Sequence, residues 1–485
     1  MARFWGCVLI ATLCAAKGAL RGEDQDAKIC DLAVVGAGIG GGYAAWRASQ
    51  AGKSVCVFEM NDRAGGRIHS LRNRGPQKDL VVEAGAYRFT AAQVCTWGMC
   101  FDTPLIRAAV KELGLKAKVY DPDPKMWDHK MRKIVDEEGN DAGYLTLPET
   151  LLEKATELGA TVSYNSKVVG LAGAGKSDGT YPLVMLQIAD GRKVLAKAVV
   201  LNIPQGPALE LLRHSAAPFD AEDPDVLYDP TTEDLMKLYI HYDDAWWIND
   251  LGLKSGRFQN ENPDSDGYLL QSPAPLSGQY HDGNVKCDLP GGRCRGFLQT
   301  YYAGEAIEYY KPYHNVNGEA AVELDPNTKE HRRLLERIHQ ALVDHHRKAL
   351  DAVNATDRVS KMRPNAGVLS IWRDSVDGIN AGCHNPKQGD DPLPSKLTDT
   401  ALQPFPDMPV FIADEAFGPL SCWAEGSLNM SHKVMDRLGV PQTRLPEGEA
   451  LDLSSPAPPT DPFLLFTDRR FAKLRAKFGE SEVVV

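Results

Sequence analysis

Residues 30–41 read CDLAVVGAGIGG, an apolar run followed at once by the pattern Gly-x-Gly-x-x-Gly. The run at 30–35 has the length and composition of a buried strand, and the stretch at 42–51 contains no breaker and predicts a helix. A second apolar run, SVCVFE at 54–59, completes a strand–helix–strand unit. The sequence therefore predicts a dinucleotide-binding turn at the carboxyl end of the first strand.

Each glycine of this pattern has a separate physical task. Gly36 permits the tight turn, Gly38 lets the backbone approach a pyrophosphate at the helix N-terminus, and Gly41 lets helix and strand pack closely. Glu59 ends the second strand, where a carboxylate accepts hydrogen bonds from an adenosine ribose and repels a 2′-phosphate. NADP is therefore disfavoured. The alternative to a dinucleotide site is a glycine-rich turn that binds no ligand.

A second glycine-rich segment favours FAD over NAD. Residues 61–70 read NDRAGGRIHS, and this R-x-G-G-R arrangement resembles the second fingerprint of flavoprotein oxidases. Gly66 allows another close backbone approach, while Arg63 and Arg67 can neutralise phosphate charge. A solvated basic loop is the alternative interpretation.

Residues 170–177 match the P-loop expression G-x-x-x-x-G-K-[ST], which would indicate nucleotide hydrolysis. A P-loop must open a helix, whereas the breakers of residues 178–182 follow here. Residues 182–204 then read as a hairpin. We therefore interpret the glycine-rich stretch as a turn in a β-meander.

Composition limits the class of protein. The chain has 485 residues, 54 Lys and Arg, 65 Asp and Glu, a net charge of −11 and 43% apolar residues. These values predict a globular chain of at least two domains. The acidic balance argues against nucleic acid or an anionic membrane as the main partner, because both favour clustered cations.

The N-terminus predicts export. Arg3 precedes an apolar run at 4–16 that is too short to span a bilayer, and small residues follow it. We interpret residues 1–19 as a secretory signal peptide and expect a secreted protein; a membrane anchor or a core strand is the alternative. Asn354 begins a glycosylation sequon, Asn-Ala-Thr, and predicts a glycoprotein.

The C-terminal residues 441–485 form a separate tail. A Pro-rich linker precedes an amphipathic stretch at 463–478 with a basic face. That stretch could contact a membrane or a partner, or dock on the body or fray. The sequence does not predict the oligomeric state.

Ten cysteines are present, and two of them lie in the predicted signal peptide. Cys287 and Cys294 flank a Pro-Gly-Gly-Arg turn and are the best candidate for a local disulfide, with Cys95 and Cys100 as a weaker pair. Cys56 lies in an apolar strand and is expected to be a free core thiol.

With these motifs the sequence resembles the flavin amine oxidase family, and within it the secreted L-amino-acid oxidases of snake venoms and mollusc secretions. The resemblance implies an α/β and α+β architecture, in which a Rossmann-like FAD-binding domain is interleaved with a mixed-sheet substrate-binding domain. It divides the chain into a signal peptide (1–19), three FAD-binding parts (28–95, 151–212 and 366–440), a short helical segment (96–150), a substrate-binding domain (213–365) and the tail (441–485). Only residues 102–160 stand where venom enzymes carry a long helical domain, with helices expected at 105–115 and 148–158, so we expect a reduced helical domain.

The resemblance also assigns substrate-side residues. The segment VEAGAYRF at 82–89 matches the family's under-flavin segment, with Ala86 at the flavin and Arg88 at the position that binds the substrate carboxylate. Lys237 matches the active-site lysine that holds a water near flavin N5. A surface or salt-bridged Arg88 and an edge-strand position for Lys237 are the alternatives.

Tyr301 is the better match to the family's substrate-contacting tyrosine and Tyr302 is the alternative, because only one of two strand neighbours faces a pocket. Trp423 matches the aromatic residue that packs over the substrate. The remaining matches bind the flavin, namely Val169 at the adenine, Glu415 after the last strand, and Ala424 at the start of the last helix. Asp414 departs from the family's usual glycine.

The resemblance implies a secreted FAD-dependent L-amino-acid oxidase, which uses O₂ to convert amino acids to 2-oxo acids, ammonia and hydrogen peroxide. A monoamine or polyamine oxidase and a non-catalytic secreted flavoprotein are the alternatives. Cys383 stands near the position of the covalent flavin linkage of monoamine oxidases, although L-amino-acid oxidases hold FAD non-covalently. His345 and His346 have no ligand partners at useful spacing, so no metal site is expected.

Overall fold

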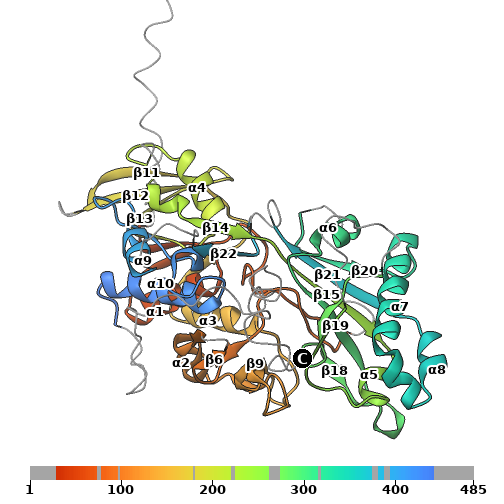
Figure 1. Cartoon of the computed structure of the whole chain (residues 1–485). Helices are drawn as coiled ribbons and strands as arrows, with labels where there is room; N and C mark the ends of the chain where they lie inside the picture. The colour runs from red at the N-terminus through yellow and green to blue at the C-terminus, as the bar shows by residue number, and fades with distance from the viewer. Residues whose placement is uncertain are drawn as a thin grey trace, which may run out of the picture.

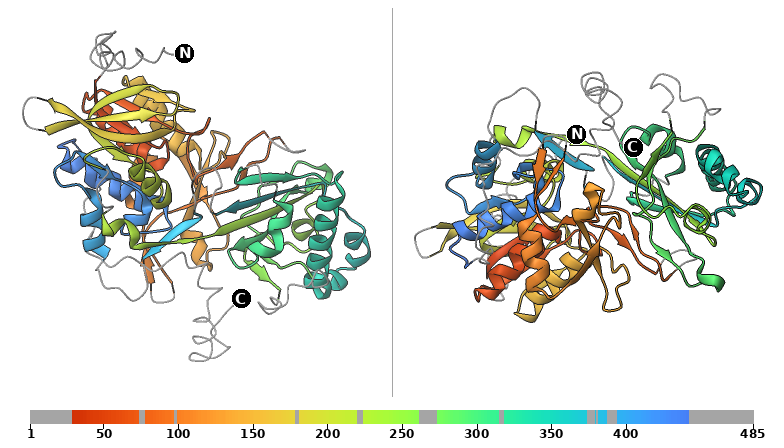
Figure 2. Two further views of the ribbon diagram at one scale, coloured as in Figure 1. Left: turned by 90° about the horizontal axis from the view of Figure 1, so that it is seen from above. Right: turned by 60° about the horizontal axis from the view of Figure 1, so that its bottom comes forward.

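The computed structural model describes residues 29–73, 78–96, 99–177, 181–219, 224–260, 273–314, 318–373, 379, 381–386 and 394–441. The predicted signal peptide at 1–19 and the tail after residue 441 lie outside these residues. Two bodies, each built on its own sheet, lie side by side and are joined by several chain crossings (Figures 1 and 2).

The first body is built on a seven-stranded sheet in the order β10-β2-β1-β13-β12-β11, with β23 paired to β13. Its strands come from three separated stretches of the chain. They are β1 (Ile29–Val35), β2 (Val55–Phe58), β10 (Thr161–Ser163), β11 (Val168–Ser177), β12 (Tyr181–Ile188), β13 (Lys193–Leu201) and β23 (Val410–Ile412). β1 pairs in parallel with β2 and β13, so the carboxyl ends of three neighbouring strands meet at one edge. The predicted strand–helix–strand unit is confirmed.

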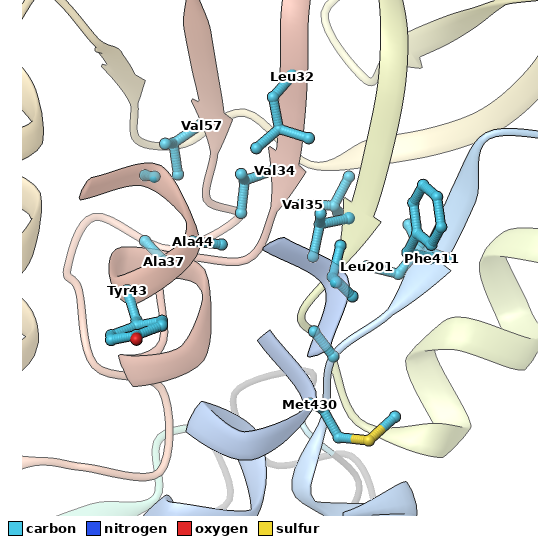
Figure 3. Close-up of a cluster of buried hydrophobic side chains, with 14 of the residues drawn as sticks. Leu32, Val34, Val35, Ala37, Tyr43, Ala44, Val57, Leu201, Phe411 and Met430 are labelled. Carbon is cyan, nitrogen blue, oxygen red and sulfur yellow. The ribbon is translucent and has the colours of Figure 1, made fainter. Parts of the chain in front are cut away.

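Three helices from distant parts of the chain cover this sheet. They are α1 (Ile39–Gln50), α3 (Thr146–Glu157) and α10 (Ala424–Arg437). α1 is buried along nearly its whole length, because α3 and α10 both pack against it. Figure 3 shows the resulting core, in which Leu32 and Val34 of β1 lie near Val57 of β2, while Leu201 and Met430 come from much later in the chain. Burial of this continuous apolar surface is the main force that joins the three stretches.

The second body is built on an antiparallel sheet in the order β16-β17-β19-β15-β21-β20, with β18 paired to β19. Its strands are β15 (Leu235–Tyr242), β16 (Arg257–Gln259), β17 (Ser277–Gln279), β18 (Val285–Lys286), β19 (Arg295–Ala303), β20 (Ala321–Leu324) and β21 (Ala366–Trp372). The long helix α7 (Lys329–Ala352) runs beside this sheet (Figure 1). Its buried Leu334, Ile338 and Leu342 join the apolar core of this body.

Short elements connect the bodies. The ribbon of β14 (Pro230–Glu233) and β22 (Cys383–Pro386) leads into β15, and the pair β3 (Ser70–Leu71) and β4 (Val82–Glu83) leads toward the cavity. The remaining pieces near them are β5 (Phe89–Thr90), β6 (Val94–Thr96), β7 (Met99–Phe101), α2 (Pro104–Glu112), β8 (Lys116–Val119) and β9 (Met131–Val135). The other helices include α4 (Gln205–Arg213), α5 (Trp246–Asn249), α6 (Ile307–Tyr310), α8 (Thr356–Ser360) and α9 (Pro394–Leu402).

The predicted helices at 105–115 and 148–158 correspond to α2 and α3. The predicted hairpin at 182–204 corresponds to β12 and β13. The interpretation of residues 170–177 as a turn is wrong, because they form most of β11 and pair with β12. A continuous strand cannot present a helix N-terminus to phosphate, so the conclusion that this is no P-loop stands.

The disulfides confirm one expected bridge and correct the expectation for Cys56. Cys287 and Cys294 form the predicted local bridge, and Cys95, which is disulfide-bonded, lies opposite Cys100 in the β6–β7 pair. The expectation of a free thiol at Cys56 is wrong, because adjacent parallel strands bring it within reach of Cys30 and the two form a bridge.

Cys383 is bridged to Cys422, and a sulfur engaged in that bond cannot also hold a flavin. The suggested covalent attachment at Cys383 is therefore wrong. Within the described part of the chain, none of the helices has the length and apolar character needed to cross a bilayer.

Candidate active site

A cavity of about 460 Å³ lies where the edge of the first sheet meets the second body. One end is formed by the glycine-rich turn after β1 and by the end of β2, and we call it the nucleotide end. The other end is formed by residues 84–88, by β15 and β19, and by the segment before α10, and we call it the substrate end. Parallel strands that end at such a switch point commonly open onto a ligand crevice.

Two glycines at the turn between β1 and α1 have no room for a side chain. Gly36 has a φ of +99°, and a Cβ on it would lie 2.3 Å from the carbonyl oxygen of Asn202. A Cβ on Gly41 would lie 2.1 Å from the carbonyl oxygen of Gly36. Gly36 and Gly38 line the cavity, whereas Gly41 packs the helix onto the turn. This geometry agrees with the tight turn predicted at Gly36 and the close packing predicted at Gly41, while Gly38 exposes backbone to the cavity.

Glu59 closes the nucleotide end. Its side chain is buried and accepts hydrogen bonds from the amides of Ala37, at 2.8 Å, and Asn61, at 2.9 Å. Burial raises the pKa of Glu59, and this effect outweighs the opposing effect of the two amides and of Arg63. The carboxylate thus ties the end of β2 to the glycine turn while lining the cavity.

The second fingerprint also lies against the cavity. Gly66, with a φ of +55°, and Arg67 both line it, while Arg63 donates to the carbonyl of Gly66 at 2.9 Å and thereby holds the loop. Gly85 was not singled out by the sequence, yet a Cβ there would lie 1.9 Å from the carbonyl oxygen of Arg67. The neighbouring Ala86 lines the cavity and donates its amide to the same carbonyl at 3.0 Å.

Arg67 is held between two carboxylates. It donates to Asp414 at 2.9 Å and also to Glu415. Burial lowers the pKa of Arg67, but the two acids outweigh it and the net shift is upward. Asp414, the departure from the family pattern, also accepts from the amide of Ala416 at 3.0 Å. Its extra negative charge is therefore compensated by Arg67 rather than directed unpaired into the cavity.

Glu415 joins this cluster to the substrate end. His384 Nδ1 lies 2.6 Å from one of its oxygens, and the amide of Cys422 donates to the other at 2.6 Å. Although burial raises the pKa of Glu415, Arg67 and His384 lower it to about 2. His384, Asp414 and Glu415 are close enough to bind a metal ion, but the guanidinium of Arg67 already binds both carboxylates. The sequence did not identify His384, since a lone histidine carries no pattern.

Two cations meet at the substrate end. Arg88 is 5% exposed and lines the cavity, with its guanidinium carbon 4.7 Å from the ring centre of Tyr87. Lys237 is 3% exposed, lies 3.4 Å from the same ring centre, and donates to the carbonyl of Glu83 at 3.2 Å. β15, which carries Lys237, lies between β19 and β21, so the edge-strand alternative is wrong. The surface alternative for Arg88 is excluded by its burial.

Tyr302, rather than Tyr301, lines the cavity. Tyr302 is the register partner of Lys237 and its ring lies edge-on to Tyr87, with centroids 6.0 Å apart. The expectation for Tyr301 is corrected, because its hydroxyl accepts from the amide of Ala306 at 3.1 Å inside the core of the second body. The physical reason is the alternation of side chains along β19.

Trp423 and Ala424 line the cavity where α10 begins, and Val169 of β11 lines the opposite end. Trp423 packs against Phe101, with ring centroids 5.1 Å apart. Two further lining residues escaped the sequence interpretation. Trp372 donates its indole N–H to the carbonyl of Ala84 at 2.7 Å, and the side chain of Asn202 accepts from the amide of Gly41 at 2.7 Å.

Profiles of known families match two stretches of this chain. Residues 34–100 match the NAD(P)-binding Rossmann-like domain, and residues 132–311 match the flavin containing amine oxidoreductases. The matched stretch at 132–311 and the fold described above are those of the flavin amine oxidases. FAD is therefore the cofactor of this chain. The cavity fits this group, since bare glycine backbone, Glu59 and Arg67 lie toward one end and the aromatic walls toward the other.

The individual relatives that this chain matches are distant. Aplysianin-A from Aplysia kurodai is 24% identical over 250 residues, covering 49% of this chain and 42% of the relative. Coproporphyrinogen III oxidase from Propionibacterium freudenreichii subsp. freudenreichii is 35% identical over 97 residues, covering 20% of this chain and 16% of the relative. Protoporphyrinogen oxidase 2 from Arabidopsis thaliana is 33% identical over 87 residues, covering 18% and 14%. The chain thus spans less than half the length of each of these relatives.

An engineered triple mutant of putrescine oxidase has a similar structure. It superimposes with a TM-score of 0.53 at 14% sequence identity, covering 84% of this chain and 99% of the other. At this identity the likeness concerns the fold, and it confirms the predicted flavin amine oxidase architecture.

Proposed function

We propose that this protein is an FAD-dependent L-amino-acid oxidase, which converts an amino acid, O₂ and water to a 2-oxo acid, ammonia and hydrogen peroxide. The observation that carries the proposal is Arg88, a buried arginine in the cavity wall that shares the ring of Tyr87 with Lys237. A guanidinium presents paired donors that match the two oxygens of a carboxylate.

The charge of the substrate end supports a substrate with a carboxylate. Arg88 and Lys237 are both cations, whereas the acids in the described lining are Glu59, Glu210, Asp414 and Glu415. Asp414 and Glu415 are bound by Arg67, and Glu210 pairs with Lys167. A diamine would bring a second ammonium toward two like charges, which costs free energy in a desolvated site. An amino acid instead brings an opposite charge.

The chain's own groups would orient the substrate and exclude water. Arg88 holds the carboxylate, and the rings of Tyr87, Tyr302 and Trp423 form an apolar wall against which the reacting Cα–N bond is fixed. Lys237 Nζ, which already donates to the carbonyl of Glu83, can hold a water and move a proton beside the reacting carbon. Bound FAD would supply the hydride acceptor and the electron transfer to O₂.

Matched pairs of substrates test this proposal. Purified, flavin-loaded protein is given L-phenylalanine and 2-phenylethylamine, L-leucine and 3-methylbutylamine, and L-ornithine and putrescine, with D-phenylalanine as a stereochemical control. Peroxide formed from L-amino acids, and slowly or not at all from the matched amines, supports the proposal. Peroxide from amines alone would replace it with the monoamine or polyamine oxidase alternative. Flavin-loaded protein that yields no peroxide from any compound would favour a non-catalytic flavoprotein.

Two observations favour the alternative, an oxidase that acts on amines. The structurally similar protein is a putrescine oxidase variant, and Arg88 contributes to lowering the pKa of the buried Asp128, so part of its charge is compensated within the protein. The pair of ornithine and putrescine separates the two functions most directly, because the compounds differ only in the carboxylate.

We further propose that the protein is secreted. Three disulfides join described residues, and such bonds persist mainly in oxidising compartments. Asn354 is exposed in the turn between α7 and α8, where a glycan would have room. Expression in a secretory eukaryotic host should release protein that begins near residue 20. Glycosidase treatment should shift its mass, and the shift should shrink in Asn354→Gln; intracellular, unshifted protein would contradict the proposal.

A further inference from the structure

A buried cluster of opposite charges lies behind the substrate end. His281 Nδ1 is 3.1 Å from Asp121 Oδ2, and His281 Nε2 is 3.3 Å from Asp128 Oδ2. The side chains of both aspartates are fully buried and that of His281 is 1% exposed. Burial raises the pKa of Asp128, but Arg257, His281 and Arg88 lower it to about 2.

The cluster joins two parts of the chain that are far apart in sequence. Asp121 and Asp128 belong to the connection between β8 and β9, and Asp128 lies in the short helix Trp127–Lys130. His281 follows β17 of the second body, and Arg257, which begins β16, donates to Asp128 at 2.8 Å. Ser255 adds a hydroxyl that donates to Asp121. Charged and polar contacts therefore fix the connection at 120–128 to the second body.

This connection forms the back of the Arg88 site. The guanidinium carbon of Arg88 lies 5.3 Å from the ring centre of Tyr120 and 5.5 Å from that of Trp127. The ring of Tyr120 in turn meets His281 edge-on, with centroids 4.7 Å apart. The guanidinium carbon of Arg257 also lies 5.1 Å from the ring centre of Trp127. Tyr120 therefore contacts both His281 and the Arg88 guanidinium, and Trp127 contacts both Arg257 and the same guanidinium.

We propose that His281 is a positioning residue for Arg88, acting through Tyr120 and Trp127. The inference rests on the proposed function, in which Arg88 binds the substrate carboxylate. The imidazole ring lies between two buried carboxylates, with one nitrogen 3.1 Å from Asp121 and the other 3.3 Å from Asp128, and so bridges them. Without the bridge two buried carboxylates would face each other, and the 120–128 connection would move to hydrate them.

Carboxylate binding provides a test that does not depend on turnover. Benzoate is titrated into the flavin-loaded protein, and its binding is followed by the perturbation of the flavin absorption band. His281→Gln is expected to raise the Kd for benzoate, and the KM for L-amino acids, by about ten-fold while leaving kcat and the matched amines within about two-fold. The control His339→Gln removes another buried histidine of the same body, bonded to Tyr242 and to the carbonyl of Val359, and should leave the benzoate Kd unchanged.

A double-mutant cycle and a crystal structure complete the test. Arg88→Met combined with His281→Gln should weaken benzoate binding no more than Arg88→Met alone, because the histidine acts only through the arginine. The crystal structure of His281→Gln should show the Arg88 guanidinium displaced. If Arg88 stays in place, or if the two substitutions are additive, the inference is overturned.

Failure of the proposed function is distinguishable from failure of this inference. If the parent protein binds no benzoate and oxidises only amines, Arg88 does not bind a substrate carboxylate. The position of Arg88 in the His281→Gln crystal structure still decides whether His281 positions Arg88. Stoichiometric metal in the purified protein that disappears in His281→Gln would overturn the bridge in favour of a metal site formed by the same three residues.

Discussion

The nucleotide end of the cavity exposes backbone, whereas the substrate end is formed by side chains. At the nucleotide end, Gly36, Gly38 and Gly66 expose backbone, and Glu59 is fixed by two amides, one of them in the turn it serves. At the substrate end, side chains form the site, and Arg88 and Lys237 come from segments about 150 residues apart. A site made of backbone depends on glycine, because a side chain would fill the space for the ligand. A site made of side chains depends on packing between distant segments, which holds the charged groups in place.

The largest effect should come from filling space at the nucleotide end. Gly41→Val would place Cβ 2.1 Å from the carbonyl oxygen of Gly36, so α1 could not pack on the turn. We expect insoluble or flavin-free protein, measured by the ratio of flavin to protein absorbance. Gly52→Asn is the control, because Gly52 has open space around it and a φ that asparagine tolerates. Normal flavin content in Gly41→Val would contradict a backbone-built end.

At the substrate end, loss of Arg88 should separate amino acids from amines. Arg88→Met is expected to lower kcat/KM for L-amino acids by about 10²- to 10³-fold, since a buried charged partner of a carboxylate is worth about 3–4 kcal/mol. The matched amines have no carboxylate to lose and should change little. Equal losses for both classes would assign Arg88 a purely structural role.

Lys237→Met should affect both classes of substrate alike. We expect kcat to fall by about 10²-fold for amino acids and amines, because a positioned proton-transfer group contributes about that factor. Stopped-flow measurement of flavin reduction and of its reoxidation by O₂ locates the affected half-reaction. Lys237→Arg keeps the charge and is the matched control. A loss confined to amino acids would instead make Lys237 a second carboxylate ligand.

A milder change is expected from Glu59→Gln. The glutamine side chain keeps an oxygen for one backbone donor but lacks the negative charge. We therefore expect the Kd for FAD to rise by about ten-fold. Fluorescence titration of the apoprotein with FAD measures it. Substrate KM values at saturating FAD should not change, and a change in them would show that the two ends are coupled.

The smallest effect on activity should follow removal of the bridge between Cys383 and Cys422. Since the bridge closes a loop of 39 residues, Cys383→Ser with Cys422→Ser should lower the free energy of unfolding by about 2–4 kcal/mol. Thermal melting measures this loss, and Cys287→Ser with Cys294→Ser, which opens a loop of only 7 residues, should cost less. The flavin should stay extractable by acid in every variant.

The difference between the two ends also explains what could be predicted from the sequence. The strand–turn–helix, Glu59 and the second glycine pair lie within 40 residues and leave a spacing pattern that local sterics dictate. Arg88 and Lys237 were found through family resemblance. Tyr301 is the better match to the family motif, but two adjacent aromatics in a strand cannot be told apart without knowing which face of the sheet is covered.

Other features had no readable pattern. His281 and His384 act through partners more than 30 residues away, and single histidines are common in cores. Cys30 lies beside Cys56 only because β1 and β2 pair in parallel. The sequence does not give this sheet order, so Cys56 reads as a free thiol. The Gly-rich stretch at 170–177 was assigned to a turn, although its pairing with β12 extends it into a strand.

The interleaving of the first body has a consequence for how the protein is made. β23 pairs with β13, and α10 packs on α1, although nearly 400 residues separate the two helices. A ribosome releases the chain from its N-terminus, so the glycine turn emerges early and must wait for α10 before its cavity is closed. Throughout that interval the apolar face of α1 lacks its final cover. The cavity can therefore enclose FAD only after residue 437 has been translated.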